Sequence, residues 1–237
     1  MTHPRFDQLN ASLRTSGLDA VILNPGPTLT HLTGLHFHLM ERPVVLLFAQ
    51  DQDPAIVLPE LELQKVASLP YNLHVFSYPE NPSEWDAAFR KAVQALGLDG
   101  KRIGVEPRQL RLLEFRHVKA GAPEADYPDA SDVLSNLRLK KDKAEVDAMR
   151  RAVKIAQEAL EATIPSIKIG MTEKEISSEL VVQLLNHGSE PEMPFAPIVS
   201  AGPNSANPHA SPTERKLQEV ICWLWIGAQA SMVISLT

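Results

Sequence analysis

Short apolar runs separated by polar or proline-rich segments organise roughly the first 125 residues of the chain. The runs AVIL, VVLLF and AIVL predict buried strands, and helix-forming segments alternate with them. Predicted strands occupy residues 20–23, 44–48, 55–58, 73–78 and 102–105, and predicted helices occupy 6–16, 61–68, 83–96 and 110–119. The sequence NPGP at 24–27 is a breaker after the first strand, and 49–54 suits a hairpin turn. Alternating strands and helices are typical of an α/β layer.

A second pattern begins near Asp129 and leads into a long amphipathic segment. Between Lys143 and Thr163, apolar residues recur at helical spacing and charged residues fill the opposite face. The apolar positions are Val146, Met149, Val153, Ala156, Leu160 and Ile164. Because Pro165 and Gly170 follow, the pattern predicts one long helix that ends near residue 164.

The sequence TEKE at residues 172–175 has the pattern of a capping box. Thr172 can accept a hydrogen bond from the backbone of Glu175, and the Glu175 side chain can return the bond. The pattern predicts a helix that runs to about Asn186 and ends at Gly188.

The segment after this helix combines prolines with turn-forming residues. Pro197 favours an edge strand or an extended conformation for residues 195–200, because proline cannot donate to a strand ladder. Residues 201–208 then form a turn-rich loop that leads to His209. Within it, Asn204 and Ser205 are expected to shape the loop by bonding to its backbone.

Composition adds limits to this picture. The chain has 237 residues, of which 44% are hydrophobic and 22% charged, as in ordinary globular proteins. A formal net charge of -6 argues against a nucleic-acid partner, which usually needs a basic face. No apolar stretch reaches the length of about 18 residues that predicts a membrane span, and the N-terminus lacks a secretory signal. Cys222 is the only cysteine, which excludes an intramolecular disulfide, so we expect a cytoplasmic protein without a membrane partner.

Three segments of the second part of the chain are informative through their order and spacing, although none of them alone would identify a family. They are LRLKKDKAEVDAMRRAVKIAQEAL, then IGMTEKEISSEL, then FAPIVSAGPNSANPH. Their order is similar to the start of the pita-bread catalytic domain of aminopeptidase P, prolidase, methionine aminopeptidase and creatinase. The N-terminal part, including Leu32-Thr33-Gly34, resembles the creatinase-type N-terminal domain. Over residues 6 to about 219, the chain thus resembles this family, on its Xaa-Pro peptidase branch.

The resemblance implies an α/β N-terminal creatinase-like domain followed by an incomplete α+β pita-bread domain. The expected boundaries are residues 1–128 for the first domain and 129–219 for the first part of the second. Residues 220–237 are expected to be a frameshifted tail.

The family's activity also implies cofactors and partners. The resemblance implies two divalent metals (Mn, Co or Zn) in an intact family member, where they activate a water and polarise the scissile carbonyl. In relatives the ligands are two aspartates, a histidine and two glutamates, all downstream of the motif that contains His209. We therefore expect no metal in this chain. The implied substrate is a proline-containing peptide or dipeptide, and the intact form is expected to be a homodimer.

The last residues depart from the family where the first metal ligand is expected. Inserting one G after the Glu219 codon lets the neighbouring frame read EGDLLVVDWGASVNGYISD, which contains the missing motif. Much of this match uses free codon choice, but Trp225-Ile226 forces an aspartate codon and Met232-Val233 forces a glycine codon. Leu236-Thr237 permits the second aspartate. The sequence thus predicts a reading-frame change, and the alternative is a natural, divergent C-terminus.

His209 is the candidate catalytic residue. In relatives the matching histidine lines the active site and contacts the substrate or the tetrahedral intermediate, and histidine can act as donor or acceptor near neutral pH. Phe195 and His209 are the candidate substrate-binding residues, and no residue is assigned as a metal ligand. Against these stand a plain loop histidine for His209 and core packing for Phe195. His36 and His38 could reach one metal, but no Asp, Glu or Cys set lies near them in sequence, which favours a structural role.

These observations favour an Xaa-Pro metallopeptidase of the aminopeptidase P or prolidase type. The parent would hydrolyse the bond before proline at a peptide N-terminus, whereas this chain is predicted to be inactive. Two alternatives stay open: a non-catalytic binding or dimerisation module, and a metal-free creatinase-type hydrolase in which the histidine acts as base.

Overall fold

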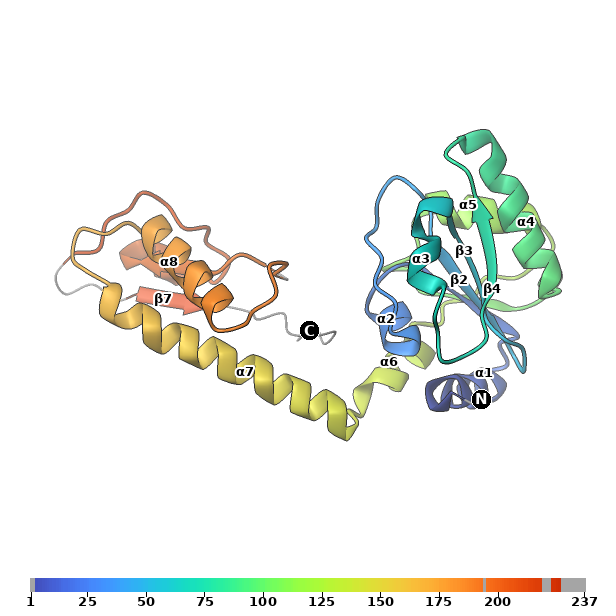
Figure 1. The fold of residues 1–237 in the computed structure, drawn as a ribbon, viewed down its shortest axis with the longest axis horizontal. Helices are drawn as coiled ribbons and strands as arrows, with labels where there is room; N and C mark the ends of the chain where they lie inside the picture. Colours follow the sequence, from blue (N-terminus) through green and yellow to red (C-terminus); the bar gives the residue numbers. More distant parts are fainter. Residues whose placement is uncertain (1–2, 194, 219–222, 227–237) are drawn as a thin grey trace. The chain divides into compact units, whose positions relative to one another are not determined.

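The computed structural model describes residues 3–193, 195–218 and 223–226, and the chain divides into two units (Figure 1). Unit 1 comprises residues 1–140 and unit 2 comprises residues 141–237. The division therefore lies later in the chain than the boundary predicted near Asp129.

A five-stranded mixed sheet forms the centre of unit 1. Its strands are β1 (Ala20–Leu23), β2 (Val45–Ala49), β3 (Ala55–Pro59), β4 (His74–Tyr78) and β5 (Ile103–Val105), in the order β4-β3-β2-β1-β5. β2 runs antiparallel to β1 and to β3, whereas β4 is parallel to β3 and β5 is parallel to β1. All five predicted strands are confirmed, and so is the hairpin between β2 and β3.

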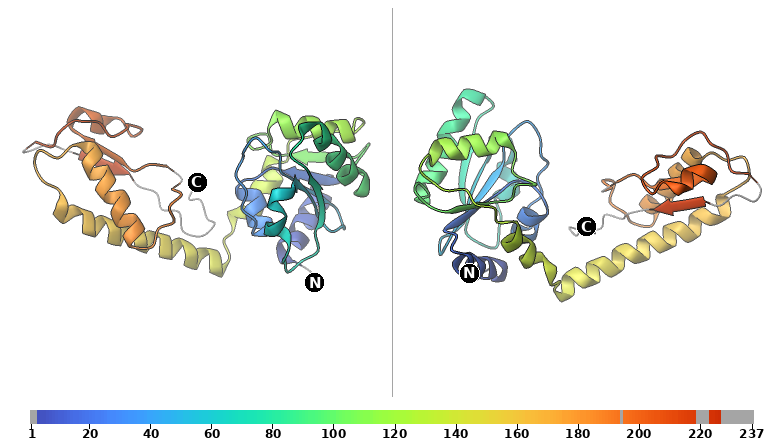
Figure 2. Two further views of the ribbon diagram at one scale, coloured as in Figure 1. Left: turned by 45° about the horizontal axis from the view of Figure 1, so that its top comes forward. Right: turned by 180° about the vertical axis from the view of Figure 1, so that it is seen from behind.

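Helices cover both faces of this sheet, as the views in Figure 2 show. One face packs against α4 (Trp85–Ala95) and α5 (Leu112–Gly121), and the other packs against α1 (Pro4–Ser16), α2 (Pro27–Thr33) and α6 (Ser131–Leu139). Adjacent residues of β1 alternate between the two cores, since Ile22 belongs to one and Val21 to the other. A sheet buried on both faces explains why its strands appear as continuous apolar runs.

Four features of unit 1 differ from the sequence prediction. The helix predicted at 61–68 is a 3-10 turn, η1 (Glu60–Glu62), followed by the single turn α3 (Leu63–Val66), and another 3-10 turn, η2 (Pro82–Glu84), precedes α4. The predicted breaker at 24–27 ends in Pro27, which begins α2, because proline is favoured in the first turn of a helix. The helix α6 was not predicted; it packs on α1 and α2, which places it in unit 1.

Unit 2 contains two helices, two short strands and two 3-10 turns within the described residues. They are α7 (Lys143–Thr163), η3 (Ile164–Ser166), α8 (Glu173–Asn186), β6 (Ile198–Ala201), η4 (Gly202–Ala206) and β7 (Trp223–Ile226). β6 and β7 pair antiparallel, with Val199 opposite Trp225. α8 packs against both α7 and β6. The strand predicted for 195–200 thus begins only at Ile198.

Both helices of unit 2 begin at capping boxes. Asp142 caps α7 together with Glu145, and Thr172 caps α8 together with Glu175, as the TEKE pattern predicts. Each box satisfies orphan backbone N–H groups at a helix start. α7 ends at Thr163 and α8 ends at Asn186, so the predicted extents of both helices are confirmed.

Within the described residues of unit 2, the apolar core is small. One cluster joins Ile176, Val199, Ala201 and Leu217, and a second joins Ala159, Leu180 and Leu184. The buried positions of α7 are Ala148, Ala152, Ala159 and Thr163. The predicted apolar stripe lies beside this face, so Val153 and Ile164 are 48% and 51% exposed.

Candidate functional site

The loop that carries His209 begins where β6 ends. Gly202 has a φ of 57°, a left-handed conformation that glycine adopts without the steric cost of a Cβ atom, and it starts η4. Ser205 Oγ donates to the Gly202 carbonyl at 2.6 Å, which confirms its predicted role in shaping the loop. The chain therefore turns away from the strand within a few residues of Ala201.

His209 lies in a tight turn after η4. Its backbone N–H donates to Asn207 Oδ1 at 3.0 Å, and the Ala210 N–H donates to the Asn207 carbonyl at 3.1 Å. Asparagine side chains often stabilise turns in this way, by replacing a backbone acceptor. The residue is exposed, so the turn presents the imidazole to solvent.

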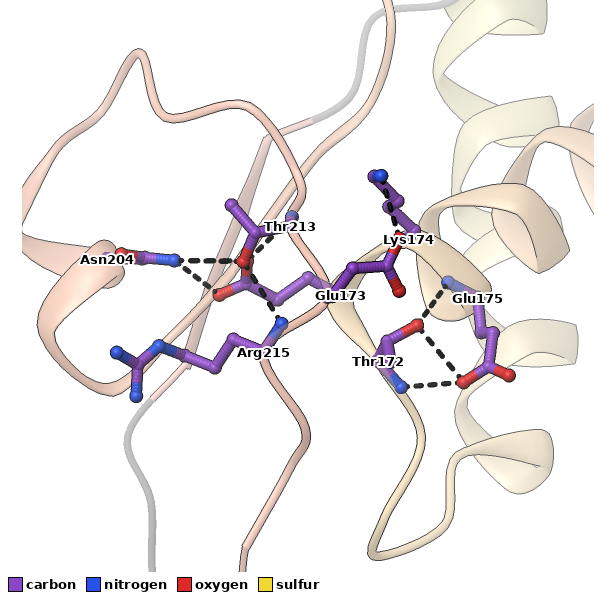
Figure 3. Close-up of polar contacts among 8 residues, drawn as sticks. Thr172, Glu173, Lys174, Glu175, Asn204, Thr213 and Arg215 are labelled. Atoms are coloured by element: carbon purple, nitrogen blue, oxygen red, sulfur yellow. Dashed lines mark hydrogen bonds and ion pairs between the residues drawn. The ribbon is translucent and has the colours of Figure 1, made fainter.

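A buried glutamate, Glu173, connects this loop to α8. It is the first residue of the helix and its side chain is completely buried. Oε1 accepts from Ala201 N at 2.7 Å and Oε2 accepts from Thr213 N at 2.9 Å and from Thr213 Oγ1 at 2.6 Å. Asn204 Nδ2 lies 3.1 Å from each carboxylate oxygen. Figure 3 shows Asn204 and Thr213 converging on the carboxylate.

Backbone bonds join the two segments beside this carboxylate. Glu173 N donates to the Arg215 carbonyl at 3.0 Å, and Leu217 N donates to the Met171 carbonyl at 2.8 Å. An isolated antiparallel bridge pairs Thr172 with Lys216 between them. Residues 213–217 therefore run antiparallel to 170–174, and the end of the loop is fixed against the start of α8.

The electrostatics of Glu173 favour the charged form. Burial by itself raises the pKa of this carboxyl, but hydrogen bonds from Thr213, Ala201 and Asn204 outweigh it, so the pKa lies below the ordinary value. The position at a helix N-terminus also favours an anion. Glu173 is therefore a carboxylate at neutral pH.

The sequence prediction missed the part that Glu173 plays. Within TEKE, only Thr172 and Glu175 form the capping box, with Thr172 N donating to Glu175 Oε2 at 2.7 Å. Asn204 was expected to bond to the loop backbone, but its side-chain amide donates to Glu173. The partners of Glu173 lie 28 to 40 positions away in sequence, so no local pattern indicates them.

The two predicted substrate-binding residues flank β6 along the chain. Phe195 precedes the strand and is 41% exposed, whereas His209 follows it. Between Phe195 and the strand, the Pro197 carbonyl accepts from Ser177 Oγ of α8 at 3.1 Å. In the described part of unit 2, neither Phe195 nor His209 bonds to the Glu173 carboxylate.

The described ranges contain no group of three or more His, Cys, Asp or Glu side chains that could hold a metal ion. His36 and His38 are exposed in unit 1, where Lys65 Nζ donates to the His36 carbonyl at 3.2 Å. In the same ranges, no helix has the length and hydrophobicity needed to cross a bilayer.

Two protein families match this chain. The family described as Creatinase/Prolidase N-terminal domain matches residues 5–140, and Metallopeptidase family M24 matches residues 147–235. The first match ends at the division between unit 1 and unit 2.

Curated relatives carry peptidase names. An Xaa-Pro dipeptidase of Lactobacillus helveticus is 27% identical over 90% of this chain and 58% of its own length. A probable dipeptidase PepE of Mycobacterium bovis is 28% identical over 88% of this chain and 54% of its own length. The chain thus spans rather more than half the length of these relatives.

Solved structures show the same likeness. A dipeptidase from Pyrococcus horikoshii superposes with a TM-score of 0.81 at 28% identity, over 92% of this chain and 59% of its own. A prolidase from Thermococcus sibiricus superposes with a TM-score of 0.84 at 23% identity, over 97% of this chain and 62% of its own, which bears on the fold alone. The predicted fold class is confirmed: an α/β N-terminal domain followed by part of a catalytic domain of the M24 type.

Proposed function

The chain belongs to the family described as Creatinase/Prolidase N-terminal domain, and on this basis we propose that it derives from a peptidase specific for Xaa-Pro bonds. Such an enzyme hydrolyses the bond between an N-terminal residue and a following proline. The observation that carries the proposal is the succession of both family regions in one chain, with the His209 loop following β6 in the second. The name of the Lactobacillus helveticus relative, Xaa-Pro dipeptidase, supports the same substrate class.

In this proposal His209 is the catalytic residue and Phe195 contributes to substrate binding. His209 is exposed on a turn fixed by Asn207, so its imidazole is available to a peptide. Phe195 has an exposed ring surface that can contact the apolar ring of proline. His209 would donate to or accept from the peptide near the scissile carbonyl, as a neutral imidazole can do both.

The residues present do not fit a two-metal centre. The described residues contain no suitable ligand group, and after Glu219 the sequence contains no Asp, Glu or His. In a two-metal peptidase the metals supply an activated water and polarise the scissile carbonyl. We therefore derive no step through metals, and we propose that the 237-residue chain by itself does not turn over Xaa-Pro peptides.

Metal analysis and peptide cleavage on the purified chain test this proposal together. We expect metal well below one equivalent after dialysis and no cleavage of an Xaa-Pro dipeptide above the buffer rate, with or without added Mn²⁺. The Xaa-Pro dipeptidase of Lactobacillus helveticus serves as the positive control in the same assay. Tightly bound, stoichiometric metal together with turnover would refute the predicted inactivity.

The sequence of residues 220–237 supports a second part of the proposal, a change of reading frame after Glu219. The aspartate codon forced by Trp225-Ile226 lies where the family motif has its first metal ligand. The M24 match reaches residue 235, an extent equally compatible with a C-terminus that diverged in place. The nucleotide sequence of this region separates the two explanations, since only a frame change leaves the complete motif in the neighbouring frame.

A non-catalytic binding module is the second candidate function. It is favoured by the hydrogen bonds that Ala201 and Thr213 donate to Glu173, which organise the His209 loop without any metal ligand. We expect an Xaa-Pro dipeptide to bind in titration calorimetry and His209→Ala to weaken that binding. This candidate also predicts that the chain forms a homodimer, and gel filtration measures its oligomeric state. If the dipeptide does not bind and the chain is monomeric, this candidate is wrong.

A further inference from the structure

The loop that carries His209 has both of its ends on one carboxylate. Ala201, at the start of the loop, donates its N–H to Glu173 Oε1 at 2.7 Å. Thr213, at the other end, donates its N–H and its hydroxyl to Oε2 at 2.9 Å and 2.6 Å. Asn204, within the loop, donates its amide to both oxygens. The two ends of the loop are therefore held together by a single side chain.

All of these partners are donors, so the network requires an acceptor-only group. An ionised carboxylate accepts at both oxygens, whereas a glutamine has one oxygen and one NH₂ group. In Glu173→Gln, the NH₂ group would face either Ala201 N–H or the two Thr213 donors. Because the site is completely buried, water cannot replace the lost bonds without opening it. An ionised carboxylate therefore matches all of these donors, whereas a glutamine does not.

Helix capping does not account for this residue. Glu175 fills the capping-box position, and its side chain is exposed. Glu173 instead turns its carboxylate toward β6 and the loop, as Figure 3 shows for its contacts with Asn204 and Thr213. The two glutamates lie two residues apart on the same helical turn and have different partners, which makes them a matched pair for experiment.

We propose that Glu173 is a positioning residue that closes the loop between Ala201 and Thr213 and thereby fixes the turn presenting His209. The functional part of this inference rests on the proposed role of His209 in peptide recognition. Glu173 acts through the loop backbone and has no contact with substrate in this role. Its carboxylate determines where β6 ends relative to residues 213–217, and so where the exposed histidine stands.

Hydrogen exchange and NMR of Glu173→Gln in the 237-residue chain test the proposal. We expect amides of residues 202–212 to exchange roughly tenfold to a hundredfold faster, because charge-assisted bonds at both ends are lost. The ring signals of His209 should shift and broaden. Amides of α7 and the middle of α8 should stay protected, and Glu173→Asp should restore part of the loop protection. Glu175→Gln, the matched control, should leave both the loop and the His209 signals unchanged.

Unchanged loop exchange and unchanged His209 signals in a folded Glu173→Gln variant would overturn the proposal. If that variant does not fold, Thr213→Val decides, because it removes one donor to Oε2 and leaves the backbone bond. We then expect faster exchange near residues 210–213 with α8 still protected, and no such change refutes the role of Glu173.

Peptide binding separates this inference from the proposed function. If Glu173→Gln releases the loop but His209→Ala leaves dipeptide affinity unaltered, Glu173 positions the loop and the role of His209 in recognition is wrong. If His209→Ala weakens binding and Glu173→Gln changes neither the loop nor the affinity, the positioning role is wrong and the proposed function stands.

Discussion

Within each of the two units of this chain, a different kind of interaction stabilises the fold. In unit 1 a five-stranded sheet is buried by helices on both faces, and two large apolar clusters share its strands. In the described residues of unit 2 the apolar clusters are small, and polar bonds at two capping boxes and at Glu173 fix the helix starts and the loop. Unit 1 should therefore be sensitive to lost volume, and unit 2 to lost charge or hydrogen bonds.

The largest effect is expected from a cavity in the core of unit 1. Leu47 lies in the central strand β2 and is fully buried, so Leu47→Ala should lower the free energy of unfolding by about 2–5 kcal/mol. Urea unfolding, monitored through hydrogen exchange of the sheet amides, measures this free energy for unit 1 alone. Leu112→Ala, at a position 62% exposed in the same unit, should change stability by less than about 0.5 kcal/mol. Similar losses for the two variants would contradict the comparison.

A smaller and local effect is expected in unit 2 at acid pH. The pKa of Glu173 is lowered in the fold, so its contribution is present above the unfolded value of about 4.3 and is lost as the pH falls through the folded value. Amide exchange of residues 202–212, corrected for intrinsic rates, should therefore accelerate as the pH falls below that unfolded value. Glu173→Gln should lack this transition.

Other charged groups surround Glu173 and need a control. They are Lys174, Glu175, Glu214 and Arg215, with Lys174 Nζ 2.8 Å from Glu214 Oε1. The pKa of Glu175 is also lowered, by its bonds from Thr172, so Glu175→Gln should retain the loop transition and lose only helix-start stability. If the faster amide exchange of the loop at acid pH disappears in Glu175→Gln, the pH effect belongs to the helix cap at Glu175 and not to Glu173.

The smallest effect concerns a glutamate of unit 1 with the opposite response to pH. Burial raises the pKa of Glu106, although a bond from Thr28 and the charge of Arg138 oppose the shift. Its contribution is fully present below the unfolded value and is lost as the pH rises through the folded value. Glu106→Gln can still accept from Thr28, and it should flatten the pH dependence of unit 1 stability above the unfolded pKa of a glutamate, which is about 4.3. The exposed Glu124→Gln is the control, and equal pH profiles for the two variants would contradict this assignment.

Local patterns predicted most elements correctly where the physical cause is local. A capping box predicted the start of α8, helical spacing of apolar residues predicted α7, and continuous apolar runs located β1, β2 and β3. The errors have physical reasons as well. Pro27 both ends an extended segment and begins a helix, and α6 is assigned to unit 1 only by its packing on α1 and α2.

The candidate site was predictable only in part. A resemblance to known peptidases indicated His209 and Phe195, and turn-forming residues indicated the loop. Glu173 could not be recognised, because its partners Ala201, Asn204 and Thr213 meet it only through the tertiary fold. In sequence it resembles any acidic residue at the start of a helix.

The hydrogen bonds of Ala201 and Thr213 to Glu173 also make the middle of the loop structurally independent of the residues that anchor its ends. Because Ala201 and Thr213 are joined through Glu173, the path between them can lengthen, shorten or change composition while the anchoring points remain in place. For protein engineering, the same geometry makes residues 205–211 a graft site, because a foreign recognition segment placed there would have both of its ends held by the hydrogen bonds to Glu173.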